Sequence, residues 1–147
     1  MLFLPVRPQY AAKILSGEKT IELRRRCPLR CVKGSRVLFY ATSPKCELVV
    51  VARVQKVLHG AKTALWDQVE KQACVDKSTF MDYFEGRADG FGIAIENARQ
   101  FSTSIDLDML RREWPGFRPP QGFCYLSDAQ ICSVNRWLEA GARRSVA

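Results

Sequence analysis

The alternation of side chains in residues 20–25 constrains the fold more than any other feature of this sequence. Ile21 and Leu23 are two positions apart, and so are Glu22 and Arg24. Residues at this spacing share a face of a β-strand, so the aliphatic pair would face a core while the charged pair faces the other way. A charged strand face is usually exposed to solvent, but a strand that lines an anion-binding cleft presents the same pattern.

Further strands are predicted from short apolar or alternating runs that are bounded by turn residues. The β-branched run at 48–57 is typical of a central strand, and residues 98–101 extend the strand at 91–95 or pair with it. The predicted strands cover residues 2–6, 35–41, 48–57, 91–95 and 123–126.

Helices are predicted between these strands and near the end of the chain. Asp76 or Ser78 would cap one helix, and Ser104 would cap the next. Ser127 and Gln130 form a capping box in front of the last helix. The predicted helices cover residues 8–16, 64–73, 78–86, 105–114 and 127–140, and residues 141–147 are expected to fray.

The length and composition fit one globular domain that covers residues 1–147. The chain is 47% hydrophobic and 26% charged, which is ordinary for a folded protein, and it contains no repeat or linker. Strands dominate the first half, with short helices inserted between them. This order predicts an α+β fold, a small mixed β-barrel decorated by short α-helices.

The formal net charge of +8 favours a polyanionic partner, with nucleic acid ahead of an anionic membrane. No apolar run approaches the length of a membrane span, and residues 1–6 are too short for a signal peptide. We therefore expect a soluble cytoplasmic protein with no membrane partner. RNA or a nucleotide is the expected ligand, and DNA stays open as an alternative.

The cysteine and histidine pattern predicts neither a metal site nor a cofactor. The six cysteines include no C-x-x-C pair, and His59 is the only histidine. A zinc site would therefore need four thiolates at irregular spacing. The cysteines are interpreted as reduced and mostly packed.

Residues 24–36 form the densest positive segment, with six cations and no acid. Most of this segment, residues 27–34, is predicted to be a loop. Neutralising several phosphates would make nucleic-acid binding fall steeply with salt, although a solvated loop has the same composition. The cations assigned to the phosphate backbone are Arg25, Arg26, Arg30, Lys33 and Arg36.

Four stretches of the chain resemble one family. Residues 17–24 read Gly-x-Lys-x-x-Glu-x-Arg and resemble the G-x-K-x-x-E-x-R signature of the ASCH domain, a branch of the PUA-like superfamily. Similar agreement is found at Arg7-Pro8-x-Tyr10, at residues 37–44 and at residues 117–121. The likeness extends from about residue 4 to residue 126.

This resemblance implies a PUA-like β-barrel with a cleft and a role in RNA binding, RNA metabolism or transcription regulation. Some small bacterial members are similar to amidohydrolases that deacetylate N-acetylated cytidine. In those enzymes the signature Lys works with a Thr, and this sequence has Glu22 at the position of that Thr. The amidohydrolase nucleophile is therefore missing here.

Within the signature, Lys19 can donate to a phosphate or a base carbonyl, or form a structural ion pair with Glu22. The pair is three residues apart, so a turn or bulge at Thr20 would be needed to bring the side chains together. Glu22 can also fix Arg24 as a fork for a phosphate or a base edge. In an enzyme, Lys19 and Glu22 would be the catalytic pair, as charge stabiliser and general base.

Other residues are candidates for ligand binding. Tyr40 follows the basic loop and is predicted to stack on a base, unless it is a core tyrosine. Tyr10 has a weaker claim of the same kind. Arg7 and Arg118 are expected to face the cleft, and Ser43 would contact a ligand or only form a turn.

Three functions stay open on the sequence alone. The first is a binding module whose cleft accepts RNA or a nucleotide. The second is a hydrolase that acts on RNA or a modified nucleoside, either a ribonuclease or an amidohydrolase. The third is a regulatory adaptor that binds a protein partner, for which the basic charge would be incidental.

Overall fold

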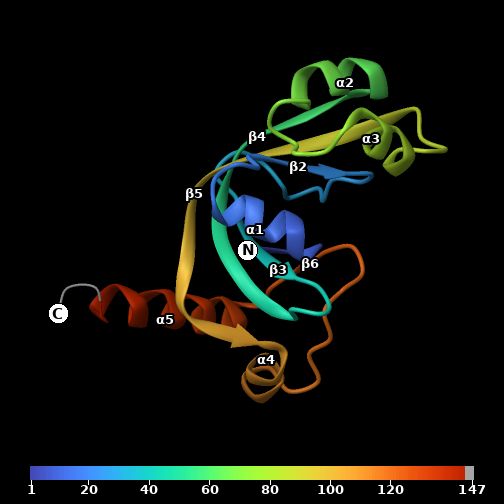
Figure 1. Ribbon diagram of the computed structural model, residues 1–147. Coiled ribbons are helices and arrows are strands. Elements are labelled where there is room, and N and C mark those ends of the chain that lie inside the picture. Colours follow the sequence, from blue (N-terminus) through green and yellow to red (C-terminus); the bar gives the residue numbers. More distant parts are fainter. Residues whose placement is uncertain (145–147) are drawn as a thin grey trace.

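A computed structural model describes the backbone of residues 1–144 and the side chains of residues 1–140. Its centre is one six-stranded sheet with the order β2-β5-β4-β3-β1-β6. The sheet curls into a half-barrel (Figure 1), and within the described residues its edge strands β2 and β6 do not pair with each other. The strands are β1 Leu2–Val6, β2 Ile21–Arg24, β3 Arg36–Ala41, β4 Glu47–Ala61, β5 Asp89–Asp106 and β6 Cys124–Tyr125.

Strands β4 and β5 form the long antiparallel pair around which the sheet curls. Their register shifts three times, and such irregularities bend a strand and increase its twist. The predicted central position of the β-branched run is confirmed, because β4 lies between β5 and β3. The two segments predicted around residues 91–101 form one continuous strand, β5. The α+β class is confirmed, and the sheet is a half-barrel.

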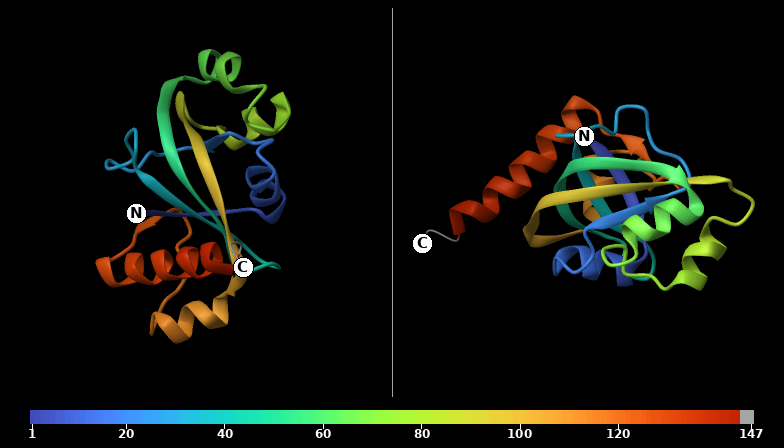
Figure 2. Two further views of the ribbon diagram at one scale, coloured as in Figure 1. Left: turned by 90° about the vertical axis from the view of Figure 1, so that its left-hand side faces the viewer. Right: turned by 90° about the horizontal axis from the view of Figure 1, so that it is seen from above.

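In residues 1–144 five helices cover the sheet, and four of them gather at its two ends. Helices α2 and α3 lie together at one end, while α4 and α5 lie at the other (Figures 1 and 2). Helix α1 lies between them against the sheet. The helices are α1 Pro8–Leu15, α2 Lys62–Val69, α3 Lys77–Tyr83, α4 Leu107–Glu113 and α5 Asp128–Arg144.

Two of the predicted helix starts are confirmed, and one is wrong. The Asp76 carboxylate accepts from the Thr79 N–H at 2.7 Å, and Ser127 and Gln130 form the expected reciprocal cap of α5. Ser104 does not cap α4, because β5 continues past it and its hydroxyl donates to Glu47 at 2.7 Å.

Asp106 caps α4 instead, by accepting from the Met109 N–H at 2.8 Å. At the C-terminus, α5 continues to Arg144 and so is longer than the predicted 127–140. Of the tail expected to fray, residues 145–147 lie outside the described residues. No helix in the described part of the chain is long and apolar enough to cross a membrane.

The alternation in β2 has the predicted consequence. Ile21 and Leu23 are buried in an apolar cluster with side chains of α2 and α3. A second cluster packs α1 against the inside of the half-barrel, and a third packs α4 and α5 against β1, β3 and β5. Glu22 and Arg24, on the other face of β2, line one cavity with residues of α1 and α3.

Candidate functional site

A cleft lies at the open side of the half-barrel, between β2, the start of α1 and helix α3. Its volume is about 580 Å³, within the range typical of small-ligand sites. Five residues singled out from the sequence line it together, although they come from three parts of the chain. These are Arg7, Tyr10, Lys19, Glu22 and Arg24.

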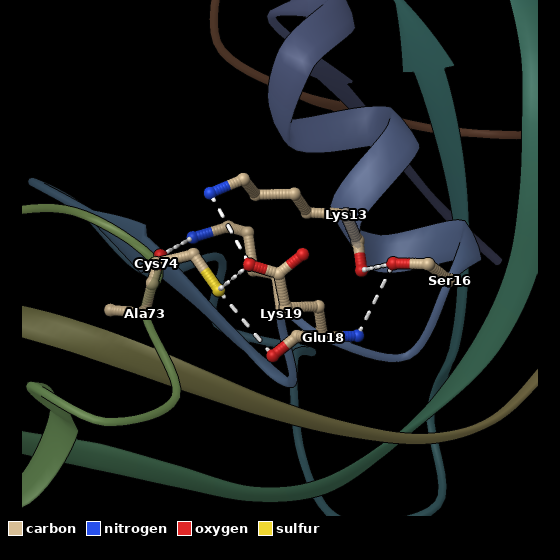
Figure 3. Close-up of polar contacts among 6 residues, drawn as sticks. All are labelled: Lys13, Ser16, Glu18, Lys19, Ala73 and Cys74. Carbon is tan, nitrogen blue, oxygen red and sulfur yellow. Dashed lines mark hydrogen bonds and ion pairs between the residues drawn. The ribbon is translucent and has the colours of Figure 1, made fainter.

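Lys19 lies at the floor of this cleft and is only 2% exposed. Its backbone N–H donates to the Lys13 carbonyl at the end of α1, and the Thr20 N–H donates to the Gln72 carbonyl. These bonds fix the irregular segment between α1 and β2. The Lys19 ammonium donates to the Ala73 carbonyl at 2.6 Å, as Figure 3 shows.

Glu22 lies between two cations. One carboxylate oxygen is 3.6 Å from the Lys19 ammonium, and the other is 3.2 Å from the Arg24 guanidinium. The Lys19 side chain is 2% exposed and that of Glu22 is 9% exposed, so the two residues form a buried structural ion pair. Removing one partner from such a buried pair typically costs about 3–5 kcal/mol of stability.

Arg24 connects the edge of the sheet to the opposite side of the half-barrel. Its guanidinium donates to the Pro5 carbonyl at the end of β1 at 2.7 Å and to the Gly122 carbonyl at 3.2 Å. Only its buried Nε–H lacks a partner among the described residues. The fork predicted for a phosphate is therefore mostly occupied by the protein, and Arg24 shapes the cleft more than it presents charge to a ligand.

Burial sets the protonation of Lys19. Desolvation lowers its pKa, and the carboxylate of Glu22 only partly offsets that effect. The ammonium also lies 5.0 Å from the centre of the Tyr10 ring, which attracts it through the ring face. Three groups therefore hold the Lys19 ammonium beneath the cleft: the Ala73 carbonyl, the Glu22 carboxylate and the Tyr10 ring. In this place Lys19 is suited to positioning Glu22 and Tyr10.

The side chains that a ligand can reach are different ones. Arg7 is exposed at the start of α1, and no carboxylate lies within 4 Å of it in the part of the chain that the structure describes. Tyr83 is 39% exposed, and its hydroxyl donates to the Leu23 carbonyl at 3.3 Å. With Glu22 and Asp82, the cleft holds three cations and two carboxylates.

Sequence reasoning missed several polar residues of the cleft. They lie on α3, in the turn after β3 and in the irregular segment before β6; the last two segments belong to the stretches that resemble the family, but no ligand role was predicted for these residues. The missed residues are Thr42, Thr79, Asp82, Tyr83 and Gln121.

The prediction that Tyr40 stacks on a base is wrong. The residue is 1% exposed and belongs to the cluster under α4 and α5, with its ring centre 5.6 Å from that of Phe3. Because Arg36, Leu38 and Tyr40 share a face of β3, the ring points away from the cleft into the core. Burial raises the pKa of the Tyr40 phenol. Among the described residues, no group is placed to form a hydrogen bond with the phenol hydroxyl.

The cations of the basic loop do not line the cleft, so the expected grip of this loop on the same ligand is not supported. Arg25 donates to the Glu85 carbonyl at 2.9 Å, and Arg30 stacks 4.1 Å from the centre of the Tyr125 ring. Arg36 lines a separate cavity. The predicted binding residues that lie outside the cleft are Arg25, Arg26, Arg30, Lys33, Arg36, Tyr40, Ser43 and Arg118.

No group of three or more His, Cys, Asp or Glu residues suited to a metal ion occurs among the described side chains. The cleft is lined by ammonium, guanidinium, carboxylate, hydroxyl and amide groups.

Comparison with known proteins gives consistent matches. The ASCH domain model matches residues 4–114. An ASCH domain-containing ribonuclease of Zymomonas mobilis is 32% identical over 119 residues, which cover 81% of this chain and 79% of that protein. The large ribosomal subunit protein uL22 of Ureaplasma parvum is 28% identical over 109 residues, 74% of this chain and 33% of that protein.

Solved structures agree with these matches. The crystal structure of ASCH from Zymomonas mobilis superposes with a TM-score of 0.86 at 27% identity, covering 92% of this chain and 93% of that one. The N-terminal domain of Staphylothermus marinus McrB, at a TM-score of 0.54 and 10% identity over 92% of each chain, shares the fold alone. The signature around Lys19 and Glu22, the ASCH domain match over residues 4–114 and the half-barrel shared with the Zymomonas mobilis structure all agree. This chain therefore belongs to the ASCH domain family.

Proposed function

We propose that the cleft binds single-stranded RNA, one nucleotide of which enters it. The observation that carries this proposal is the juxtaposition of exposed Arg7 with the buried network of Lys19, Glu22 and Arg24 at the mouth and floor of one cavity. A rigid charged floor fixes the shape of the site, while a cation without a protein partner is free to bind a phosphate.

The other cleft groups suit a base. Tyr10 and Tyr83 offer aromatic surface on which an unpaired base can stack, at about 1–3 kcal/mol per base. Thr42, Thr79 and Gln121 offer hydroxyl and amide groups that can pair with base edges. The names of the two curated relatives, a ribonuclease and a ribosomal protein, favour RNA over the other polyanions that a charge of +8 would attract.

Fluorescence anisotropy with a labelled single-stranded RNA tests the binding. Arg7→Gln is expected to weaken binding about threefold to tenfold, the loss of one phosphate contact, without disturbing the fold. Arg26→Gln is the matched control, because it removes the same charge from an exposed position outside the cleft. Equal effects of the two substitutions, or no binding by the unmodified protein at low salt, would refute the proposal. Unlabelled DNA as competitor separates RNA from DNA.

A second candidate function is RNA hydrolysis in the same cleft, and it is favoured by the relative that is named a ribonuclease. In this version the Glu22 carboxylate takes the proton of a ribose 2′-hydroxyl, whose oxygen attacks the adjacent phosphorus. The bond to the 5′-oxygen breaks, that oxygen takes up a proton, and a 2′,3′-cyclic phosphate remains. Exposed Arg7 would stabilise the charge on the phosphorus oxygens.

The products distinguish hydrolysis from binding. A labelled RNA with a single 2′-deoxy position should stay uncut at that position if the 2′-hydroxyl is the nucleophile. Glu22→Gln should abolish cutting in samples that far-ultraviolet circular dichroism shows to be folded, because this change also destabilises the buried network. Cutting that persists in Glu22→Gln would come from another site or from a contaminant, and binding without any cutting would leave a binding module.

A further inference from the structure

A second cavity, of about 290 Å³, lies between the sheet and α5 and shares no lining residue with the cleft. Three arginines from three adjacent strands meet there: Arg36 of β3, Arg53 of β4 and Arg99 of β5. Helix α5 and helix α3 lie at opposite ends of the half-barrel (Figures 1 and 2). This cavity is therefore separate from the cleft that α3 covers.

The sheet register explains why the arginines meet. Arg36 lies directly opposite Arg53 in the antiparallel pair of β3 and β4. Arg99 lies opposite Val51, two residues from Arg53 and therefore on the same face of β4. Like charges placed opposite each other destabilise a sheet, so this arrangement is unfavourable unless another group neutralises it.

The protein itself supplies little neutralisation. None of the three guanidinium groups has a carboxylate within 4 Å in residues 1–140, where side chains are described. Glu139 lines the cavity and Glu96 lies opposite Arg53 in the β4–β5 pair, but neither carboxylate lies within 4 Å of the three groups. Within this cluster, the Arg53 guanidinium donates a hydrogen bond to the Gly34 carbonyl at 3.2 Å. Burial, followed by the charges of Arg53 and Arg99, lowers the pKa of Arg36, as mutual repulsion requires.

We propose that Arg36, Arg53 and Arg99 form a second anion-binding site, which takes a phosphate group. Guanidinium forks match the oxygens of a phosphate, and the amides of Asn97 and Asn135 line the same cavity as further donors. The phosphate comes either from a free oligophosphate or from the backbone of a nucleic acid. The second source makes the site an extension of the RNA path beyond the cleft, and that part rests on the proposed function.

Pyrophosphate probes the site without RNA. In a nitrogen–proton NMR titration, the side-chain amide signals of Asn97 and Asn135 should shift in the unmodified protein. They should not shift in Arg53→Gln/Arg99→Gln, which changes two exposed residues and leaves half-buried Arg36 in place. Arg111→Gln/Arg112→Gln is the control, because it removes the same charge from exposed positions of α4. Signals that do not move, or that move equally in Arg53→Gln/Arg99→Gln, would overturn the site.

Single-stranded RNAs of four and sixteen nucleotides distinguish the two sources. We expect Arg53→Gln/Arg99→Gln to weaken binding of the sixteen-nucleotide strand about tenfold and to leave binding of the short strand unchanged. The slope of log affinity against log salt concentration for the long strand should fall in magnitude by about 1.4. An equal loss in the Arg111→Gln/Arg112→Gln control, or no loss, would confine the site to free oligophosphates and overturn the RNA extension. If neither strand binds the unmodified protein, the proposed function fails, and the pyrophosphate titration alone decides whether the arginines bind phosphate.

Discussion

Replacing Glu22 should destabilise this chain far more than replacing an exposed carboxylate nearby. The Lys19–Glu22 and Arg24–Glu22 separations are 3.6 and 3.2 Å. At an effective dielectric constant of about 20, each attraction is worth ~5 kcal/mol before desolvation is subtracted. Glu22→Gln keeps the shape of the side chain but leaves two cations close together, and we expect a loss of about 3–5 kcal/mol in the free energy of unfolding.

Lys19→Met should cost less. Glu22 keeps Arg24 as a partner, and the desolvated ammonium disappears, so the main loss is the bond to the Ala73 carbonyl, about 1–3 kcal/mol. The double variant should lose about 2 kcal/mol less than the sum of the two single losses, because Lys19 is no longer left uncompensated. The double-mutant cycle therefore measures how strongly the two charges depend on each other.

Urea unfolding followed by fluorescence of the buried tryptophans supplies these free energies. Glu18→Gln is the matched control, because the Lys13–Glu18 pair is 3.4 Å long but 40% and 61% exposed (Figure 3), and such pairs contribute about 0–1 kcal/mol. If Glu22→Gln costs no more than Glu18→Gln, or if the two single losses simply add, the buried network is not the structural floor of the cleft.

Three further predictions concern other parts of the molecule. Gly90→Ala should cost about 1–3 kcal/mol in urea unfolding, since the added methyl would overlap the Phe84 ring; its register partner Gly60, with open space around it, should accept Ala with little change. Tyr40→Phe should leave stability unchanged or raise it by up to ~1 kcal/mol, because the buried hydroxyl lacks a hydrogen-bond partner in the described residues, and a loss above 1 kcal/mol would reveal one. Because the pKa of Lys19 is lower in the folded state than its ordinary value of 10.5, the unfolded chain binds more protons between those two values. Stability relative to Lys19→Met should therefore rise with pH in that window, and a flat or falling difference would show that burial does not control the ammonium.

Local patterns carried much of the fold. The alternation at residues 20–25 placed Ile21 and Leu23 in the core and Glu22 and Arg24 in the cleft, because a strand has a fixed side-chain period. Capping residues located α3 and α5 for a similar reason, since a cap depends on neighbours in sequence. The prediction that Ser104 caps a helix was wrong, because pairing with β4 extends β5 through this residue although its local preference is for a helix start.

The candidate site was only partly predictable. The signature identified Lys19, Glu22 and Arg24, but not that carbonyls of residues 5, 73 and 122 would accept hydrogen bonds from Lys19 and Arg24. Those partners are distant in sequence, and only the curl of the sheet brings them together. Tyr40 and the basic loop were assigned to the cleft by proximity in sequence, whereas the face of β3 and the path of the loop direct them elsewhere. The arginine cluster under α5 depends on the register of three strands.

A crystal structure of this chain with a four-nucleotide single-stranded RNA tests the central claim most directly. The account predicts a phosphate within hydrogen-bond distance of Arg7, a base against Tyr10 or Tyr83, and an unchanged Lys19–Glu22–Arg24 network beneath them. An RNA strand bound along the basic loop at residues 25–36, with the cleft empty, would contradict it.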